Sequence, residues 1–310
     1  MLDLRRLQLL AALEADGTMT AAAARLHMST SAISQQITLL EREVSLPLLE
    51  RVGRRVRLNE AGKALVAHYR EIAVAVEAAE TSLSLFHTDV RGRVAISTFP
   101  SFCSSILPHA LMALRRAYPA LATVVRDMEP VESVARLRSG DIDVAVVDDL
   151  HEVSFDGVVS SVLARDEIML CLPADYHPLP PSTVHLEELA GERWIFDSEG
   201  SAFEVFTRGL CRRAGFEPDV VGHCSNLIAM LGLVRAGCGV ALMSELNLGR
   251  ETEDLFVRHL DPLCSRDVLV LTRTSGLTPA VRAVVKELRA ATRVRYNAGP
   301  VGRQGVAFPS

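Results

Sequence analysis

The N-terminal part of the chain alternates between apolar and polar positions with the period of an α-helix. Leucines recur at helical steps at Leu4, Leu7, Leu10 and Leu13, which predicts a first helix within residues 1–17. Residues 18–42, TMTAAAARLHMSTSAISQQITLLER, predict a short helix, a tight polar turn and a second helix. The inward-facing positions are Ala22, Ala23 and Leu26 in the shorter helix, and Ile33, Ile37 and Leu40 in the longer one. Ser29 follows the turn, where its side-chain oxygen can cap the second helix.

The outward face of that second helix is polar, and its residue types suit contact with DNA. Most of these positions fall in the first two turns, where a helix-turn-helix places the side chains that contact base edges. Gln can pair with the edge of adenine, while Ser and Thr bond several base edges or phosphates. The candidate DNA contacts on this helix are Ser29, Thr30, Ser31, Ser34, Gln35 and Thr38. The competing interpretation is an Ala-rich helical hairpin with a solvated polar face.

An arginine-rich segment follows the helix pair. Residues 50–58, ERVGRRVRL, combine strand-forming residues with a turn at Gly53, which predicts a short hairpin or wing. Its four arginines are Arg51, Arg54, Arg55 and Arg57, with no acidic residue between them. The planar guanidinium group binds phosphate oxygens in a bidentate way. A run of charges is usually a solvated surface, but this density beside a helix-turn-helix favours contact with the DNA backbone.

Residues 60–90 predict a long helix with a single apolar stripe. Asn59 can cap it, Glu60 favours its positive end, and no proline interrupts it before about His87. The stripe consists of Leu65, Tyr69, Ile72, Val76, Ala79, Leu83 and Phe86, spaced by three or four residues. Such a stripe must be buried, and a second copy of the chain is its simplest partner. The alternative is that the helix packs along its own chain.

Beyond residue 90 the pattern changes to alternating strands and helices. Strands are predicted at 94–96, 121–128, 142–147, 167–172, 194–196, 220–222, 240–243 and 268–272. Helices are predicted at 106–117, 131–139, 202–214, 227–236 and 279–292. This alternation predicts parallel sheets covered by helices on both faces. Residues 293–310 are predicted to form a flexible tail.

Composition is typical of a cytoplasmic protein of more than one domain. The chain has 310 residues, nearly half of them hydrophobic, and lacks an apolar run of the roughly 18 residues that a membrane span needs. The net charge of −5 is unevenly distributed, because residues 1–59 carry +2 and the remainder −7. The basic excess is therefore local to the predicted DNA-contacting segment, and an acidic body discourages indiscriminate binding to DNA.

The sequence contains no pattern of an enzyme or of a metal site. The six cysteines form no CxxC pair, and the nine histidines form no HxxH or HExxH pattern. A G-x-S-x-G elbow, a phosphate-binding loop and a dinucleotide fingerprint are also missing. The cysteines are interpreted as reduced, mostly buried side chains, with a redox-sensing pair as an open alternative.

Residues 2–66 closely resemble the LysR-type family of bacterial transcriptional regulators. The resemblance has no gap and includes the AA..L turn, S.SA.S.QI..LE, PL.ER and R.VRL...G elements. It implies a winged helix-turn-helix domain at 1–59, a dimerising linker helix at 60–90, and an effector-binding domain of two α/β lobes at 91–292. That domain would resemble periplasmic solute-binding proteins, with lobe I at about 91–163 and 267–292 and lobe II at about 164–266. The resemblance also places Ser31, Ser34 and Gln35 in the groove, and Thr20 and Arg54 near the DNA backbone.

Three segments that enter helices are candidates for the effector site. They are residues 97–102, 197–201 and 224–226, and by resemblance each corresponds to an effector-contact region. The predicted effector-binding residues are Thr98, Ser101, Phe102, Asp148, Asp197, Ser201 and Asn226. The carboxylates would favour an amine, and the serines and helix ends a carboxylate, so an amino acid would satisfy both. The competing interpretation is that the Ser and Asn residues only cap helices.

These features together predict a sequence-specific transcriptional regulator without catalytic activity. Its expected partners are operator DNA, a small-molecule effector such as an amino acid or organic acid, a second or further copies of itself, and RNA polymerase if it activates transcription. No metal or cofactor is expected. A redox-sensing regulator is the main alternative. A solute-binding protein or an enzyme is disfavoured, because the chain has an arginine wing and no secretion signal or catalytic motif.

Overall fold

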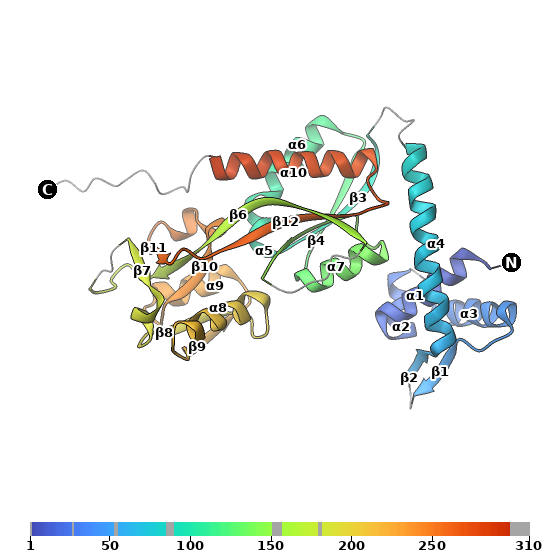
Figure 1. The fold of residues 1–310 in the computed structure, drawn as a ribbon, viewed down its shortest axis with the longest axis horizontal. Coiled ribbons are helices and arrows are strands. Elements are labelled where there is room, and N and C mark those ends of the chain that lie inside the picture. Colours follow the sequence, from blue (N-terminus) through green and yellow to red (C-terminus); the bar gives the residue numbers. More distant parts are fainter. Residues whose placement is uncertain are drawn as a thin grey trace. The chain divides into compact units, whose positions relative to one another are not determined.

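The computed structural model describes residues 2–26, 28–52, 55–84, 90–150, 157–178 and 182–297. The chain divides into two compact units, Met1–Leu83 and Ser84–Ser310, each with its own hydrophobic core (Figure 1). Within the described ranges, no helix combines the length and the apolar character needed to cross a membrane.

The N-terminal unit contains a helix-turn-helix followed by a hairpin and a long helix. Its elements are α1 (Leu4–Asp16), α2 (Met19–Arg25), α3 (Thr30–Val44), β1 (Leu49–Val52), β2 (Arg55–Leu58) and α4 (Glu60–Ser84). Ser29 caps α3 by accepting a 3.1 Å hydrogen bond from the backbone N–H of Ala32, as the sequence predicts. The strands pair antiparallel, with Leu49 opposite Leu58. The predicted order of elements is therefore confirmed in this unit.

The core of this unit lies between α1, α2 and α3. Six of its side chains are the leucine and isoleucine positions predicted to face inward, and all are at most 2% exposed: Leu7, Leu10, Leu13, Ile33, Ile37 and Leu40. Burying each such side chain contributes about 1.5–3 kcal/mol. Leu4, the first leucine of the predicted stripe, is instead exposed at the start of α1. The helix pair therefore packs on a rigid apolar core.

The start of α4 is fixed against the segment between α3 and β1. Asn59 accepts a 2.9 Å hydrogen bond from the N–H of Gly62 and donates from its amide nitrogen to the carbonyl oxygen of Pro47 at 2.9 Å. Gly62 passes so close to the carbonyl oxygen of Leu48 that a Cβ atom could not fit there without displacement. These contacts set the direction in which α4 leaves the hairpin.

The C-terminal unit is an α/β structure. Its strands are β3 (Gly92–Thr98), β4 (Leu121–Asp127), β5 (Val144–Asp148), β6 (Val158–Leu172), β7 (Thr183–His185), β8 (Arg193–Asp197), β9 (Asp219–Cys224), β10 (Ala241–Ser244), β11 (Phe256–Asp261) and β12 (Ser265–Arg273). Its α-helices are α5 (Pro100–Ser105), α6 (Leu107–Ala117), α7 (Pro130–Ser139), α8 (Ala202–Arg213), α9 (Leu227–Arg235) and α10 (Pro279–Asn297). Three short 3₁₀ helices lie at Leu186–Leu189, Glu245–Asn247 and Arg250–Thr252.

Two long strands, β6 and β12, connect two lobes. The strand order of the main sheet is β4-β3-β5-β12-β6-β11-β7, with β10 also paired to β6. Residues 158–167 of β6 pair with β12, whereas residues 168–172 pair with β10 and β11. The double crossing between lobes is therefore made by neighbouring antiparallel strands. The predicted parallel pairing is found for β3 with β4 and β5, for β7 with β11 and for β8 with β9, but β12 runs antiparallel to both β5 and β6.

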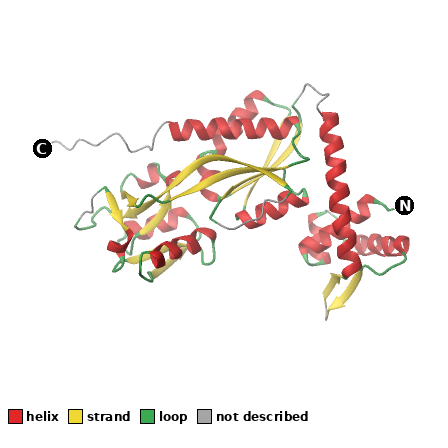
Figure 2. Ribbon diagram, in the orientation of Figure 1, coloured by secondary structure: helices red, strands yellow, loops and turns green. Residues whose placement is uncertain are grey.

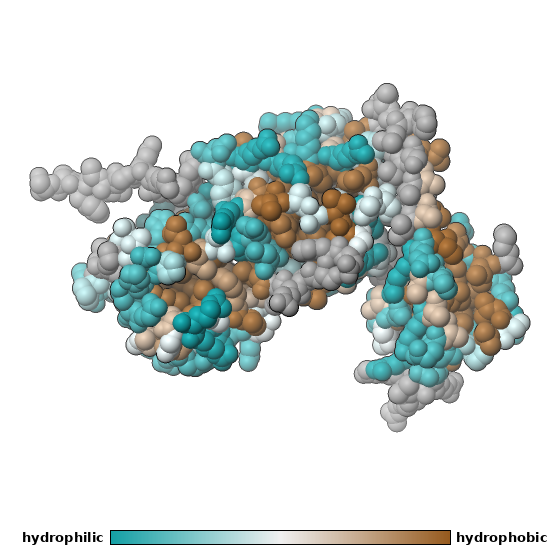
Figure 3. Space-filling view, in the orientation of Figure 1, coloured by the Kyte–Doolittle hydropathy of each residue, from teal (hydrophilic) through white to brown (hydrophobic). Residues whose placement is uncertain are grey.

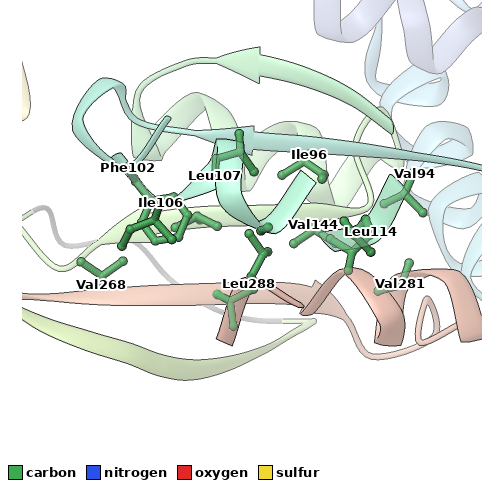
Figure 4. Close-up of a cluster of buried hydrophobic side chains, with 14 of the residues drawn as sticks. Val94, Ile96, Phe102, Ile106, Leu107, Leu114, Val144, Val268, Val281 and Leu288 are labelled. Atoms are coloured by element: carbon green, nitrogen blue, oxygen red, sulfur yellow. The ribbon is translucent and has the colours of Figure 1, made fainter. Parts of the chain in front are cut away.

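Lobe I has a hydrophobic core on each face of its sheet. Neighbouring residues of a strand point to opposite faces, so Ile96 lies in the core beneath α6 and α10 while Ala95 lies in the core beneath α7. Helices accordingly flank the strands (Figure 2). Figure 4 shows the first core, in which Val281 and Leu288 of α10 face side chains of the sheet and of α6. The opposite face of α10 is hydrophilic (Figure 3).

The last helix is longer than predicted. It continues to Asn297, so residues 293–297 are helical and do not belong to a tail. Tyr296 packs against the core of lobe I, and Arg295 donates a 3.0 Å hydrogen bond to the carbonyl oxygen of Glu245. These contacts stabilise the extra turn. The rest of the predicted tail, 298–310, lies outside the described residues.

Candidate nucleic-acid interface and ligand cavity

The predicted DNA-contacting side chains of the helix-turn-helix lie together on the exposed face of α3. Ser29, Thr30, Ser31, Ser34, Gln35 and Thr38 are all exposed, and Thr20 is exposed on α2. Arg6 fixes α3 from behind, because its Nε donates a 3.1 Å hydrogen bond to Gln36 and its guanidinium also pairs with Glu43. The contacts of Arg6 therefore hold in place the helix that carries this polar face.

Some of these hydroxyl groups already have partners within the chain. Ser29 is used as the helix cap and lies 3.0 Å from the hydroxyl of Ser31, and Thr38 donates a 2.9 Å hydrogen bond to the carbonyl oxygen of Ser34. The side chains of Thr30, Ser34 and Gln35 form no hydrogen bond with any described residue. These three can therefore bond to a partner without breaking an existing contact.

The hairpin carries the predicted arginines at adjacent strand positions. Arg51 lies in β1 and Arg55 in β2, while Arg54 and Gly53 fall outside the described residues. Arg57 is exposed and directly opposite Glu50 in the antiparallel register. A neighbouring opposite charge partly offsets that of Arg57. The sequence pattern showed no acid between the arginines, but the strand pairing supplies one.

The apolar stripe of α4 is partly buried at its start and exposed further along the helix. Leu65 and Tyr69 pack against the core of the N-terminal unit. Further along, Ile72 is 38% exposed, Val76 41% and Leu83 65%, although all three belong to the predicted stripe. Phe86 lies outside the described residues. Among the described residues of the stripe, burial is therefore confined to its beginning.

A cavity of about 610 Å³ lies in the C-terminal unit between the lobes. Lobe I contributes the loop between β3 and α5, the end of β4 and the end of β5, and lobe II contributes the ends of β8 and β9 and the start of α9. Four of the seven predicted effector-binding residues line this cavity: Ser101, Asp148, Asp197 and Asn226. Ends of strands and starts of helices from both lobes thus meet at one place, as such folds favour.

The other three predicted residues do not line this cavity, and a role for them in effector binding stays a prediction. Phe102 is fully buried in the core of lobe I, where Figure 4 shows it beside Ile106. Thr98 is buried at the end of β3, and its hydroxyl bonds only weakly, at 3.4 Å, to the carbonyl oxygen of Phe99. Ser201 accepts a 3.1 Å hydrogen bond from the N–H of Glu204 and is the cap of α8. Strand alternation explains the position of Thr98, the buried face of α5 that of Phe102, and helix capping that of Ser201.

The floor of the cavity contains a buried arginine between two carboxylates. The guanidinium of Arg266, on β12, donates from Nε to Asp166, from Nη1 to Asp148 and from Nη2 to the hydroxyl of Ser101, each at 2.8 Å. Arg266 is 5% exposed, Asp148 4% and Asp166 0%. Asp166 also accepts hydrogen bonds from the hydroxyl of Ser244 at 2.6 Å and from the N–H of Leu246 at 3.2 Å. This network joins β5, α5, β6, β12 and the segment after β10.

Two aromatic rings enclose the same guanidinium. The ring centre of Phe99, in lobe I, is 4.5 Å from the guanidinium carbon, and that of Phe203, in lobe II, is 5.8 Å away. Aromatic faces attract cations at such distances. Arg266 therefore contacts residues of both lobes at once.

Carboxyl groups at the cavity have perturbed pKa values. Burial raises the pKa of Asp197 above its ordinary value, although the N–H of Ser198 donates a 2.7 Å hydrogen bond to it. Burial also raises the pKa of Asp148, and Arg266 opposes that shift. Removal from water raises the pKa of Asp127 as well. The cavity therefore disfavours the negative charge that its own lining carries.

Sequence reasoning missed Arg266 and Phe203, and it placed Phe99 in a candidate segment without selecting it. In the sequence, Arg266 stands between Ser265 and Asp267 and resembles a solvated charge before a strand. Its role depends on register, since it lies directly opposite Asp166, a hundred residues earlier. The motif Phe99-Pro100 before a helix was a usable signal for Phe99.

Family models match both units of the chain. Residues 4–63 match the model described as the bacterial regulatory helix-turn-helix protein, lysR family, and residues 87–293 match the LysR substrate binding domain. Together these segments contain the α3 interface and the cavity.

Individual proteins are similar over most of the chain. The transcriptional dual regulator GltC of Bacillus subtilis is 29% identical over 228 residues, which cover 74% of this chain and 76% of that protein. A hydrogen peroxide-inducible genes activator of Pectobacterium carotovorum is 27% identical over 252 residues, covering 81% and 83%. The solved structure of a full-length OxyR variant from Pseudomonas aeruginosa matches with a TM-score of 0.71 at 18% identity, covering 95% of each chain.

Proposed function

Because this chain belongs to the LysR family of bacterial transcriptional regulators, we propose that it recognises an operator through the exposed face of α3. Thr30, Ser34 and Gln35 would contact base edges, with Ser31 beside them. Thr20 and the hairpin arginines Arg51, Arg54 and Arg55 would contact phosphates, which fix the position of the protein on DNA but carry no sequence information.

The observation that carries this proposal is the unsatisfied polar face of α3. Polar side chains that have no partner among the described residues are held on a helix whose opposite face is fully buried. Such a helix can enter the major groove without rearrangement, so little ordering free energy is lost on binding.

We further propose that the protein acts as a homodimer or a homotetramer. The exposed part of the α4 stripe is apolar, and pairing with the same stripe of a second chain would remove it from water. Two α3 helices could then contact two half-sites about one turn of DNA apart. RNA polymerase would be a further partner if the protein activates transcription.

The inter-lobe cavity is the proposed effector site. Its lining comes from both lobes, so a bound small molecule would favour one arrangement of the lobes over another. An amino acid or an organic acid is the class that the sequence suggests, and no cofactor is required. The coupling to DNA would be a change in the spacing of the α3 helices, and hence in DNA bending.

A redox mechanism, which the name of the Pectobacterium relative suggests for that protein, is less well supported here. Reaction with peroxide needs an accessible thiolate. Burial raises the pKa of Cys171 to about 12 and that of Cys211 to about 11, and it also raises the pKa of Cys103, Cys224 and Cys264. These five thiols are therefore poor candidates for rapid oxidation.

In vitro selection with the full chain tests the DNA-binding proposal. We expect a random DNA pool to yield a short inverted repeat that the protein footprints, with affinity falling as salt rises because phosphate contacts release counterions. Equal affinity for the selected DNA and for a scrambled version of it would contradict the proposal.

A further inference from the structure

The described lining of the inter-lobe cavity carries more negative than positive charge. It contains five carboxylates and one guanidinium group: Asp127, Glu129, Asp148, Asp197, Glu251 and Arg266. Much of the remaining lining is apolar, including Phe99, Phe203, Leu227, Met230 and Leu242. An anionic ligand would therefore enter a cavity that already holds an excess of negative charge.

The single guanidinium group does not offset this excess. Each of its three nitrogens already donates a hydrogen bond to a residue of the protein, and two of the acceptors are the buried carboxylates Asp148 and Asp166. One positive charge between two negative charges leaves the group with a net charge of −1. Three of its five N–H groups are therefore used within the protein, and its positive charge is already more than offset before a ligand carboxylate arrives.

Asp197 faces the cavity, where the charge of Arg266 opposes but does not cancel the rise in its pKa that burial causes. It is half-buried, one of its oxygens accepts from the N–H of Ser198, and no described residue forms an ion pair with it. Burial disfavours its negative charge. A cation in the cavity would relieve that cost, since opposite charges attract strongly where water is excluded.

The cavity already accommodates one cationic group of the protein itself. The guanidinium of Arg266 lies over the ring of Phe99, close to the ring of Phe203, and pairs with the Asp148 carboxylate. The same combination of aromatic rings and carboxylates is what binds amines and guanidinium groups from solution.

We propose that the effector is an organic cation, a protonated amine or a guanidinium on an apolar body, whose charged end binds Asp197 beside Asp148. This inference rests on the proposed effector function of the cavity. An amino acid meets the requirement through its amine, whereas an organic acid without a cationic group does not. The first turn of α9, capped by Asn226, can accept the carboxylate of an amino acid, because its N–H groups lack partners within the helix.

Matched ligands test the sign of the charge that the cavity prefers. Calorimetry on the full chain would compare several amino acids, each with the amine that lacks its carboxylate and the acid that lacks its amine, for example phenylalanine, phenethylamine and 3-phenylpropanoate. We expect binding by amines or amino acids and none by the acids. Binding of the acids alone, or no binding by any amine or amino acid of the panel, would overturn the inference.

The isosteric variant Asp197→Asn tests the same point from the side of the protein. It keeps the acceptor for Ser198 but removes the charge, so we expect a higher Tm for the free protein and a loss of amine affinity of at least about tenfold. Glu187→Gln, at an exposed position of lobe II, is the matched control and should change neither quantity. A lower Tm for Asp197→Asn together with unchanged amine affinity would contradict the inference.

Binding of selected DNA by the same samples separates this inference from the proposed function. If the chain binds DNA sequence-specifically but no cationic ligand binds, the cation inference fails and the DNA-binding function stands. If cationic ligands bind and the chain shows no DNA sequence preference, the proposed function fails and the ligand class stands.

Discussion

Arg266 lies directly opposite Asp166 in the antiparallel register of β12 and β6, and its Nε donates a 2.8 Å hydrogen bond to the Asp166 carboxylate. The pair sits where these strands leave lobe I, and through Asp148 and Ser101 it is tied to the rest of that lobe. A buried network of this kind costs free energy when one member is removed, because the others stay buried without partners.

The variant Arg266→Met should destabilise the protein strongly. Two buried carboxylates would lose their only cationic partner among the described residues, at a cost of about 3–5 kcal/mol in the free energy of unfolding. Denaturant unfolding of the full chain measures this. Arg165→Met, one position from Asp166 on β6 but exposed, should cost no more than about 0.5 kcal/mol.

A combined variant distinguishes loss of the charge network from loss of packing. Adding Asp148→Asn and Asp166→Asn to Arg266→Met should recover much of the stability, because no unpaired charge remains buried. If the triple variant is less stable than Arg266→Met alone, the network is not what Arg266 stabilises.

Gln35→Ala should reduce discrimination between DNA sequences more than it reduces overall affinity. Gln35 is exposed on α3 and has no partner within the described chain. If it contacts a base, its loss should cost about 1–3 kcal/mol for selected DNA and little for scrambled DNA. Titrations of both DNAs at one salt concentration measure the difference.

Arg54→Ala provides the contrast to that variant. A lost phosphate contact should weaken binding to both DNAs alike and make the salt dependence shallower by about one unit of slope. An equal loss on both DNAs for Gln35→Ala would show that this residue does not contact bases.

Val76→Glu should weaken self-association. Val76 is 41% exposed on α4, and a charge there would be buried without a partner if the stripe pairs with a second chain. Sedimentation of the full chain should show a shift towards monomer. Glu71→Gln, on the same helix outside the stripe, should leave the association state unchanged; an unchanged state for Val76→Glu would place the interface elsewhere.

Stability should fall at alkaline pH because of buried thiols. In the unfolded chain a thiol has a pKa of about 8.5, but burial raises the pKa of Cys171 to about 12 and that of Cys211 to about 11. The folded state holds these protons more tightly, so this contribution is complete below about pH 8.5 and is lost as pH rises towards the folded values.

The expected loss is about 2 kcal/mol per thiol between about pH 7.5 and about pH 10. Urea unfolding at the two pH values measures it, and Cys171→Ala should show a smaller difference than the unchanged protein. The same difference in the variant and the parent would mean that Cys171 ionises equally in both states.

Local signals explain why the helix-turn-helix could be predicted and much of the lobes could not. The cap at Ser29 and the inward positions of α3 depend on residues within a few positions of one another. By contrast, β11 was not predicted and β6 was predicted only in its second half, because strand formation there depends on pairing with distant partners. Half-buried strands with charges, such as Phe256–Asp261, have no distinctive pattern of their own.

The candidate cavity was predicted in part for the same reason. Ser101, Asp148, Asp197 and Asn226 follow strands or begin helices, and this topology alone brings such positions together. Which side of a strand end or of a short helix faces the cavity is decided by packing, and packing placed Phe102 of α5 in the core. Arg266 could be recognised only once the register of β6 and β12 was known.

The pairing of β6 with β12 also limits how the lobes can move. Both connections between the lobes belong to one hydrogen-bonded ribbon, so neither can lengthen or slide without breaking the ladder of the other. Such a ribbon resists bending in its own plane but twists readily. The strand pairing is irregular between Val268 and Leu269, where the register shifts. We therefore expect effector binding to rotate one lobe relative to the other about a single axis, set by the twisting of this ribbon. Different ligands of the cavity should then change the size of this rotation but not its direction.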